Sequence, residues 1–391
     1  MKKVLDVLGH PEHGLKAIHI AGTNGKGSVA VMAASILEEA GYTVGVYTSP
    51  HLELESERIQ IWDGSHHMIP QDHFDELKER ARDAIREVDA GYASVFMVYT
   101  LAAYMYFAEK KPDYAVVECG VGGRIDVTNT LETPVVSVFT QIGLDHTQSL
   151  GNTIYRITKE KAGIIRPGVP VVSQSADMNV QNILRRIAES KGCSFTDVSE
   201  LTDRYRKYSL AMKGEHQLRN AATAAEAVKA AGIPVTEDAV AAGLAKAFNP
   251  GRFEVISEKP YVIIDGSHNP DAIKEMCDTF MEFTRQKKIK RSLLIFGCMR
   301  DKNSRRMVQL LTGNLRGVSY AVTAIDYERA EDTETLGRLF SEAGRGCICY
   351  DNAEEAFREA SASDYECILI TGSIYLAGTM RGYFMENNET M

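Results

Sequence analysis

The stretch KAIHIAGTNGKGSVAVMAASILEEAGYTVGVYT, residues 16–48, decides the fold. Its first six residues form a short apolar run that is typical of a buried strand, and a glycine-rich turn over residues 22–28 follows. From Val29 to Ala40 the apolar residues have helical spacing, and Gly41 is well suited to end the helix. A second strand over residues 43–48 completes a strand–helix–strand unit, whose strands we expect to be parallel. The stretch therefore predicts an α/β protein.

The same alternation continues on both sides of a predicted hinge. Residues 50–70 are polar, and we expect them to be irregular. The Asn249-Pro250-Gly251 segment interrupts both helix and strand, and it is the expected boundary between a domain of residues 1–249 and a smaller one of residues 250–391. Continuous apolar runs are typical of central parallel strands. Before the hinge we expect such strands at 114–119 and 135–140 and helices at 70–88, 96–110, 155–163, 178–191, 218–231 and 236–248; after it, strands near 252–258, 261–265, 292–296, 319–324, 347–350 and 367–371.

Composition excludes several classes of protein. With 44% hydrophobic and 25% charged residues, the chain is neither disordered nor collagen-like. Its net charge of −9 argues against a nucleic-acid or anionic-membrane partner, and the basic run of residues 285–291 is expected to be a solvated helix end. The 7 cysteines contain no CxxC pair, which favours free thiols in a reducing compartment. Because no signal region or membrane-length apolar run is present, we expect a cytoplasmic protein.

The glycine-rich turn is a candidate phosphate-binding loop. Glycines allow successive N–H groups to point into one anion-sized cavity, and the following helix adds a favourable field. Lys26 can reach the outer phosphates of a nucleotide, and the Ser28 hydroxyl can bind Mg²⁺. Gly27 interrupts the strict GxxxxGK[ST] pattern, so a plain strand–helix turn with an exposed lysine remains the alternative. The loop residues are Gly22, Thr23, Asn24, Gly25, Lys26, Gly27 and Ser28.

Four further residues are candidates for the same site. Glu118 ends one predicted central strand, and His146 follows the next, so both are expected at the edge of the sheet where the loop lies. A surface glutamate and a buried, hydrogen-bonded histidine are the respective alternatives. Ser49 can offer a hydroxyl or backbone contact to a metal, or can be a turn residue. Lys161, judged by its spacing alone, is an exposed helical lysine.

The chain resembles the folylpolyglutamate synthase/dihydrofolate synthase family of the Mur ligase superfamily. The resemblance covers nearly the whole chain and rests on motifs in a fixed order, of which GKGS in the loop points to the folate branch. The motifs are GTNGKGS (22–28), TSPHL (48–52), ERI (57–59), ECGVGGRIDVTN (118–129), LDHTQSLG (144–151), KEKAGIIRPG (159–168), GEHQLRNA (214–221), NPGRFE (249–254) and DGSHNP (265–270).

The resemblance implies a P-loop ATPase-type first domain with a mostly parallel sheet and a Rossmann-like second domain that carries the glutamate-ligase function. It also implies an ATP-dependent amide ligase, in which ATP phosphorylates a folate or dihydropteroate carboxylate and L-glutamate attacks the acyl phosphate. Electrostatic stabilisation of the phosphoryl group by Lys26 and by two Mg²⁺ ions is then expected to dominate catalysis. A cytoplasmic monomer without nucleic-acid or membrane partners is expected.

The resemblance also implies roles for individual residues. Catalytic roles fall to Lys26, His146, Lys161 and His268, and Lys161 matches a carbamylated lysine. Ser49, Glu118 and His146 match metal ligands, the loop with Asn220, Arg252 and Asp265 matches ATP contacts, and Asp126, Ser94 and Phe96 match the pterin pocket.

Three departures from the family pattern concern substrate choice, and one of them is the short stretch before GTNGKGS, where the family places part of its pterin pocket. Met97 stands where the family has a glutamate, and Glu55-Ser56 replace aromatic and polar residues. They leave open a second hypothesis, a Mur ligase relative that joins a different carboxylate and amine. A third is a nucleotide-binding regulatory protein that has lost catalysis.

Overall fold

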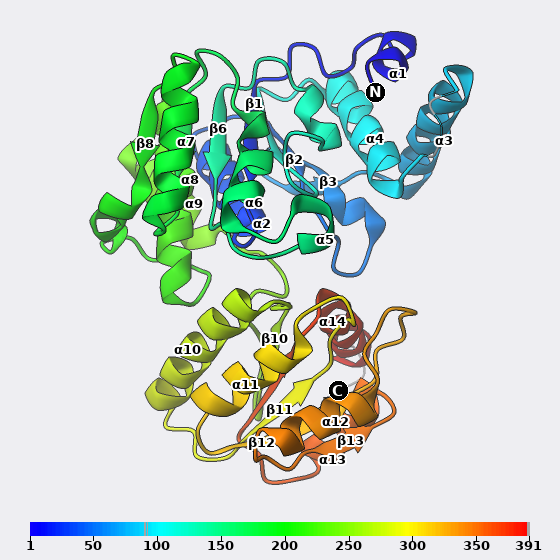
Figure 1. Cartoon of the computed structure of the whole chain (residues 1–391), viewed down its shortest axis with the longest axis vertical. Coiled ribbons are helices and arrows are strands. Elements are labelled where there is room, and N and C mark those ends of the chain that lie inside the picture. The colour runs from blue at the N-terminus through cyan, green and yellow to red at the C-terminus, as the bar shows by residue number, and fades with distance from the viewer. Residues whose placement is uncertain (90, 92, 389–391) are drawn as a thin grey trace. The chain divides into compact units, whose positions relative to one another are not determined.

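The computed structural model describes residues 1–89, 91 and 93–388. Its contacts divide the chain into two units, the first comprising Met1–Ala211 and Gln217–Phe248 and the second Met212–His216 and Asn249–Met391. Each unit contains one sheet and its helices, which confirms the α/β class (Figure 1). Within the described ranges, no helix combines the length and apolarity that crossing a bilayer requires.

The first unit carries an eight-stranded sheet in the order β4-β3-β2-β5-β1-β6-β7-β8. The central strand β1 pairs in parallel with β5 and β6, and β2 pairs in parallel with β5. The two strands of the predicted strand–helix–strand unit are therefore parallel, with β5 between them. The strands are β1 (Ala17–Ala21), β2 (Val44–Tyr47), β3 (Ile59–Trp62), β4 (His66–Met68), β5 (Tyr114–Glu118), β6 (Val136–Phe139), β7 (Val171–Ser173) and β8 (Phe195–Asp197).

Helices cover this sheet, because its central strands are apolar on both faces. Every residue of β1 and β6 is buried, as expected for strands packed between helices (Figure 1). The predicted apolar helix is α4, whose Tyr104 and Phe107 are fully buried in the core. The helices are α1 (Lys2–Val7), α2 (Lys26–Glu39), α3 (Gln71–Glu87), α4 (Val95–Lys110), α5 (Thr147–Leu150), α6 (Ile154–Lys161), α7 (Met178–Ser190), α8 (Glu215–Ala230) and α9 (Glu237–Lys246), with 3₁₀ turns that include Glu55–Arg58 and Val127–Thr130.

Three expectations for this unit were wrong or incomplete. Residues 50–70 are not irregular throughout, because β3 and β4 extend the sheet edge in antiparallel pairing. Helix α2 begins at Lys26 rather than Val29, because Gly25 adopts a left-handed conformation (φ 88°) that turns the loop directly into the helix. The strands β7 and β8 were not predicted, since each has only 3 residues.

The second unit contains a six-stranded sheet in the order β13-β12-β11-β14-β10-β9. All of its pairings are parallel except that of β9 with β10. The basic run of residues 285–291 spans the C-terminal end of α10 and is largely exposed, which confirms the expected solvated helix end. The elements are β9 (Glu254–Glu258), β10 (Tyr261–Asp265), α10 (Pro270–Lys287), β11 (Ser292–Phe296), α11 (Ser304–Asn314), β12 (Val318–Thr323), α12 (Thr333–Glu342), β13 (Ile348–Tyr350), α13 (Ala353–Ser361), β14 (Cys367–Thr371) and α14 (Ile374–Asn388). The cysteines of both units are free thiols, as expected.

Candidate active site

The loop between β1 and α2 is held open by backbone contacts to the segment after β6. The N–H groups of Thr23 and Asn24 donate to the Gln141 carbonyl at 2.7 and 3.2 Å. The Thr23 hydroxyl contacts both the N–H and the carbonyl of Gly143. These bonds fix the outer side of the loop and leave its inner N–H groups for a ligand.

The inner side of the loop is the N-terminus of α2. Gly25 is the N-cap residue, and among the residues that the structure describes no side-chain cap is recorded for this helix end. The N–H groups of Lys26, Gly27 and Ser28 belong to the first turn, where a helix supplies no carbonyl acceptor. An uncapped helix N-terminus after a glycine-rich turn is suited to bind phosphate oxygens.

Two glycines of the loop have no space for a side chain. A Cβ on Gly22 would lie 1.7 Å from Thr140 Oγ1, and a Cβ on Gly25 would lie 2.6 Å from Asn220 Oδ1. The second contact brings the predicted ATP contact Asn220, on α8, against the loop. Asn220 is 3% exposed, and its Nδ2 donates to Gln217 Oε1 at 2.9 Å. The predicted loop and Asn220 thus form one cluster that fits a nucleotide phosphate.

Lys26, the first residue of α2, faces Glu118, the last residue of β5. Lys26 Nζ lies 3.6 Å from Glu118 Oε1 and donates to the Thr23 carbonyl at 3.3 Å. Glu118 is 2% exposed, so the alternative of a surface glutamate was wrong. Its other oxygen accepts the Ser49 N–H at 3.2 Å, which brings Ser49 from the end of β2 into the group. Glu118 and Ser49 each carry side-chain oxygen, which is the donor type that Mg²⁺ prefers.

Lys161 is buried, contrary to the expectation from its spacing. Only 4% of the residue is exposed, and Nζ donates to the Gly22 carbonyl at 2.8 Å. Burial, and to a smaller extent the charge of Lys26, lower the pKa of its ammonium from 10.5 to about 7, against the opposing effects of Cys119, Asp145 and Asp126. The amine therefore contacts the backbone of the glycine-rich loop, and its pKa lies near neutrality.

His146 lies at the start of α5 and is more exposed than predicted. Its side chain is 43% exposed, so the alternative of a buried histidine was wrong. The residue adopts φ 49°, and its N–H donates to Asp145 Oδ1 at 2.8 Å. Asp145 was missed in the sequence, although it precedes the predicted histidine; its side chain is 11% exposed and it interacts electrostatically with Lys161. The signal was available, because Asp145 is the first carboxylate after β6.

Asp126 organises the loop that follows β5. Its two carboxylate oxygens accept the Val121 N–H at 2.8 Å and the Thr128 N–H at 3.0 Å. Burial raises the pKa of the Asp126 carboxyl, while hydrogen bonds from Thr128 and Val121 oppose the rise. Ser94 caps α4 by accepting the Met97 N–H at 3.1 Å. Phe96 lies against this loop, since a Cβ on Gly120 would meet its ring at 2.6 Å.

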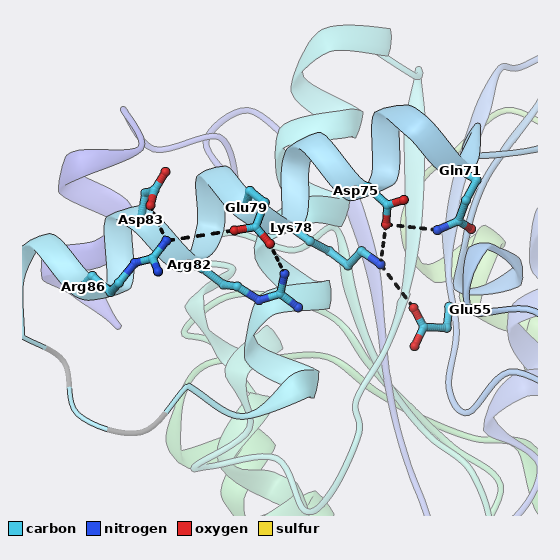
Figure 2. A network of polar contacts seen from close by, with 8 residues as sticks. All are labelled: Glu55, Gln71, Asp75, Lys78, Glu79, Arg82, Asp83 and Arg86. Carbon is cyan, nitrogen blue, oxygen red and sulfur yellow. Dashed lines mark hydrogen bonds and ion pairs between the residues drawn. The ribbon is translucent and has the colours of Figure 1, made fainter.

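Glu55, one of the residues that differ from the family pattern, forms an ion pair with α3. Lys78 Nζ lies 3.2 Å from Glu55 Oε2 and 2.7 Å from Asp75 Oδ1, as Figure 2 shows. Gln71 donates to the same Asp75 oxygen at 3.1 Å, and the ion pairs of Arg82 and Arg86 continue the network along the helix (Figure 2). Glu55 therefore connects the turn before β3 to α3.

The second unit gathers three predicted residues of its own. Asp265, at the end of β10, is 6% exposed and accepts the Phe253 and Ser267 N–H groups, both at 2.9 Å. Arg252 lies over Gly266, where a Cβ would be 2.9 Å from Nη1. His268 Nδ1 contacts the Gly266 carbonyl at 2.9 Å. Asp265 thus holds the two turns that carry Arg252 and His268.

Comparison with known proteins identifies similar sequences and folds. Residues 20–202 match the Mur ligase middle domain, and residues 251–374 match the Mur ligase glutamate ligase domain. The dihydrofolate synthase/folylpolyglutamate synthase of Bacillus subtilis is 32% identical over 97% of this chain and 93% of its own. Folylpolyglutamate synthase of Mycobacterium tuberculosis complexed with ADP is 29% identical, with a TM-score of 0.86 over 98% of this chain and 93% of that chain. Escherichia coli FolC in complex with DHPP and ADP is 27% identical, with a TM-score of 0.87 over 99% and 92%.

Proposed function

We propose a mechanism from the premise that this chain belongs to the folylpolyglutamate synthase/dihydrofolate synthase family of Mur ligases, as its motifs predicted. The chain is an ATP-dependent ligase of folate metabolism. L-Glutamate is the proposed amine, and a folate, dihydropteroate or both supply the carboxylate. The observation that carries the proposal is the Lys26–Glu118 pair, 3.6 Å apart beside an uncapped helix N-terminus.

The reaction needs an activated carboxylate, because a carboxylate is a poor electrophile at neutral pH. Its oxygen attacks the terminal phosphorus of ATP, and the bond to the leaving ADP oxygen breaks. The N–H groups of the loop bind the phosphates, and Lys26 neutralises charge on the transferred group. The amino group of glutamate then attacks the acyl phosphate, and phosphate leaves as the amide forms. Closely packed loop groups, such as Gly25 against Asn220, hold the phosphates in one position.

The metal is assigned to the oxygen donors beside Lys26. Glu118 and Ser49 are proposed ligands, and His146 is proposed as the third because it follows the neighbouring strand β6. Bound Mg²⁺ would supply positive charge that stabilises the transferring phosphoryl group. The number of ions, predicted as two, stays a prediction.

Lys161 is proposed to be carbamylated. Carbamylation requires a neutral amine, whose nitrogen forms a bond to the carbon of CO₂ and loses a proton. Burial that brings the pKa to about 7 supplies this neutral form at cellular pH. The product is an anion near the partly buried Lys26, and it replaces the like-charge repulsion between two lysines by attraction.

The remaining assignments rest on the resemblance. The proposed pterin contacts are Asp126, Ser94 and Phe96. Asp126 and Phe96 both lie against the loop after β5, which supports a shared role for these two residues. Arg252, Asp265 and His268 are proposed to serve ATP or glutamate from the second unit. The domain roles, the monomeric state and the cytoplasmic location also stay predictions.

The test is a ligation assay with purified protein. ATP, Mg²⁺ and radiolabelled glutamate are supplied with dihydropteroate or tetrahydrofolate in separate reactions. Label incorporation that requires a pteroyl substrate is expected. If neither dihydropteroate nor tetrahydrofolate supports ADP release but another carboxylate and amine do, the proposed substrates are wrong. The second candidate function is then a Mur ligase relative that joins this other pair. Met97, which replaces the family's glutamate, is the residue that favours it.

A further inference from the structure

We infer that His10, Glu12 and His13 form a binding site for one divalent transition-metal ion, with Zn²⁺ as its best-suited occupant. The three residues lie in the segment between α1 and β1. They precede the N-terminal end of β1, whereas the phosphate loop follows its C-terminal end, so this site is separate from the proposed magnesium ligands. The inference does not depend on the ligase function.

The ligand atoms already lie at coordination spacing. Glu12 Oε1 is 2.9 Å from His10 Nδ1 and 3.5 Å from His13 Nε2, and the three ligand atoms all lie within 4.8 Å of one another. Tetrahedral ligands about 2.0–2.1 Å from zinc lie roughly 3.4 Å apart. The imidazole rings of His10 and His13 stack with centroids 4.3 Å apart and an interplanar angle of 7°, so one ring must turn before both nitrogens direct their in-plane lone pairs at a single ion. The backbone therefore already brings the three ligand atoms close enough for one ion, and rotation of a histidine ring completes the geometry.

Glu12 supplies the observation that points to a ligand. Its side chain is 3% exposed, and within residues 1–89, 91 and 93–388 its Oε2 atom is buried without a hydrogen-bond partner. A buried carboxylate oxygen without a partner is costly unless a cation or donor approaches it. A metal ion bound through Oε1, the oxygen that faces both histidines, would place a cation on this same carboxylate.

Asp6 completes the arrangement as an outer partner. His10 Nε2 lies 2.9 Å from Asp6 Oδ1, so the ring can donate this N–H to the carboxylate and present Nδ1 to a metal. Carboxylate–histidine–metal relays of this kind orient the ring and raise its basicity. His13, with 54% of its side chain exposed, leaves an open side for entry and for a water ligand. Two imidazoles and one carboxylate favour zinc over Mg²⁺, which prefers oxygen.

The test is calorimetric titration of the chelator-treated full chain with Zn²⁺ in excess Mg²⁺, which saturates oxygen-rich sites. We expect one zinc ion per chain, and His13→Asn should weaken its binding at least as much as Asp6→Asn, for which a 10- to 100-fold loss is expected. His67→Gln is the matched control, since His67 is also exposed and lies 3.4 Å from an aspartate. It should bind as the wild type does.

Cobalt substitution gives a second readout that does not depend on activity. Co²⁺ at this site should show the visible absorption of a tetrahedral N/O site in the wild type and in His67→Gln, and lose it in His13→Asn. Equal zinc affinity in the wild type, His13→Asn and Asp6→Asn would overturn the inference. So would the absence of any zinc binding to the wild type in excess Mg²⁺.

Discussion

Replacement of Lys161 by methionine should change the stability of the first unit in a pH-dependent way. The pKa of Lys161 falls from 10.5 to about 7, so the folded state disfavours the charged form of its amine. At about 1.4 kcal/mol per pH unit, the charged amine costs up to about 5 kcal/mol of folding free energy. Methionine removes this cost, but it leaves the Gly22 carbonyl without the 2.8 Å hydrogen bond, a loss of about 1–3 kcal/mol.

The sign of the effect follows from proton linkage. Between pH 7 and 10.5 the unfolded state binds more protons at Lys161 than the folded state, so wild-type stability rises with pH. Below pH 7 the full cost is present, and Lys161→Met should be more stable than the wild type by about 2–4 kcal/mol. Near pH 10.5 the cost has disappeared, and the variant should be less stable by about 1–3 kcal/mol.

Urea unfolding in bicarbonate-free buffer measures this difference. The single tryptophan, Trp62, is 3% exposed in β3, so its fluorescence reports on the first unit. Lys159→Met is the control, because Lys159 lies on the same helix and is exposed. Its stability difference from the wild type should not vary over this pH range. A Lys161→Met difference that is equally flat would refute the burial argument.

Added bicarbonate separates the carbamate from the bare amine. If CO₂ reacts with Lys161 only in the folded chain, bicarbonate should stabilise the wild type by mass action and leave Lys161→Met unchanged. Ligase activity should be lost in the variant and partly restored by short carboxylic acids. Wild-type rates in Lys161→Met would show that the carbamate assignment is wrong.

Four further outcomes test the site. Lys26→Ala should lower kcat by about 10²–10³ with little change in melting temperature, as measured by ADP release. Gly25→Ala should weaken ADP binding in calorimetry, because its Cβ would lie 2.6 Å from Asn220; Gly41→Ala, at a similar φ of 89° with open space, should bind ADP normally. Asp126→Asn should raise the KM for the pteroyl substrate more than the KM for ATP, and equal changes would argue against its pterin role. Chelation of divalent ions should abolish ligation, and Mg²⁺ alone should restore it.

The four central strands of the first unit's sheet were predictable because they are largely apolar. The runs that became β1, β5 and β6 are buried on both faces, so neither register nor neighbours were needed to find them. The antiparallel strands β3 and β4 were missed for the opposite reason. His66, His67 and Met68 of β4 are all exposed, so no apolar pattern separates this edge strand from a loop.

The site was predictable where function depends on local geometry. The glycine spacing of the loop and the position of Glu118 at a strand end both follow from the sequence. Helix starts were less accurate, because Gly25 was assigned to a loop and not recognised as a left-handed N-cap. The burial of Lys161 could not be predicted from the spacing of residues in its helix, because residues far away in the sequence, such as Gly22, surround it.

Two glycines, one in the loop after β5 and one just after α6, allow close backbone packing beside Lys161. A Cβ on Gly123 would lie 2.6 Å from the Lys161 carbonyl, and a Cβ on Gly163 would lie 2.3 Å from Arg124 Cα. The loop after β5 can therefore pack directly on the end of α6, as the 2.7 Å bond from the Arg124 N–H to the Glu160 carbonyl shows. This close approach buries Lys161 and directs Nζ to the Gly22 carbonyl behind the phosphate loop. Close packing at these glycines helps to keep water away from Lys161. This burial is the main cause of the lowered pKa of its ammonium.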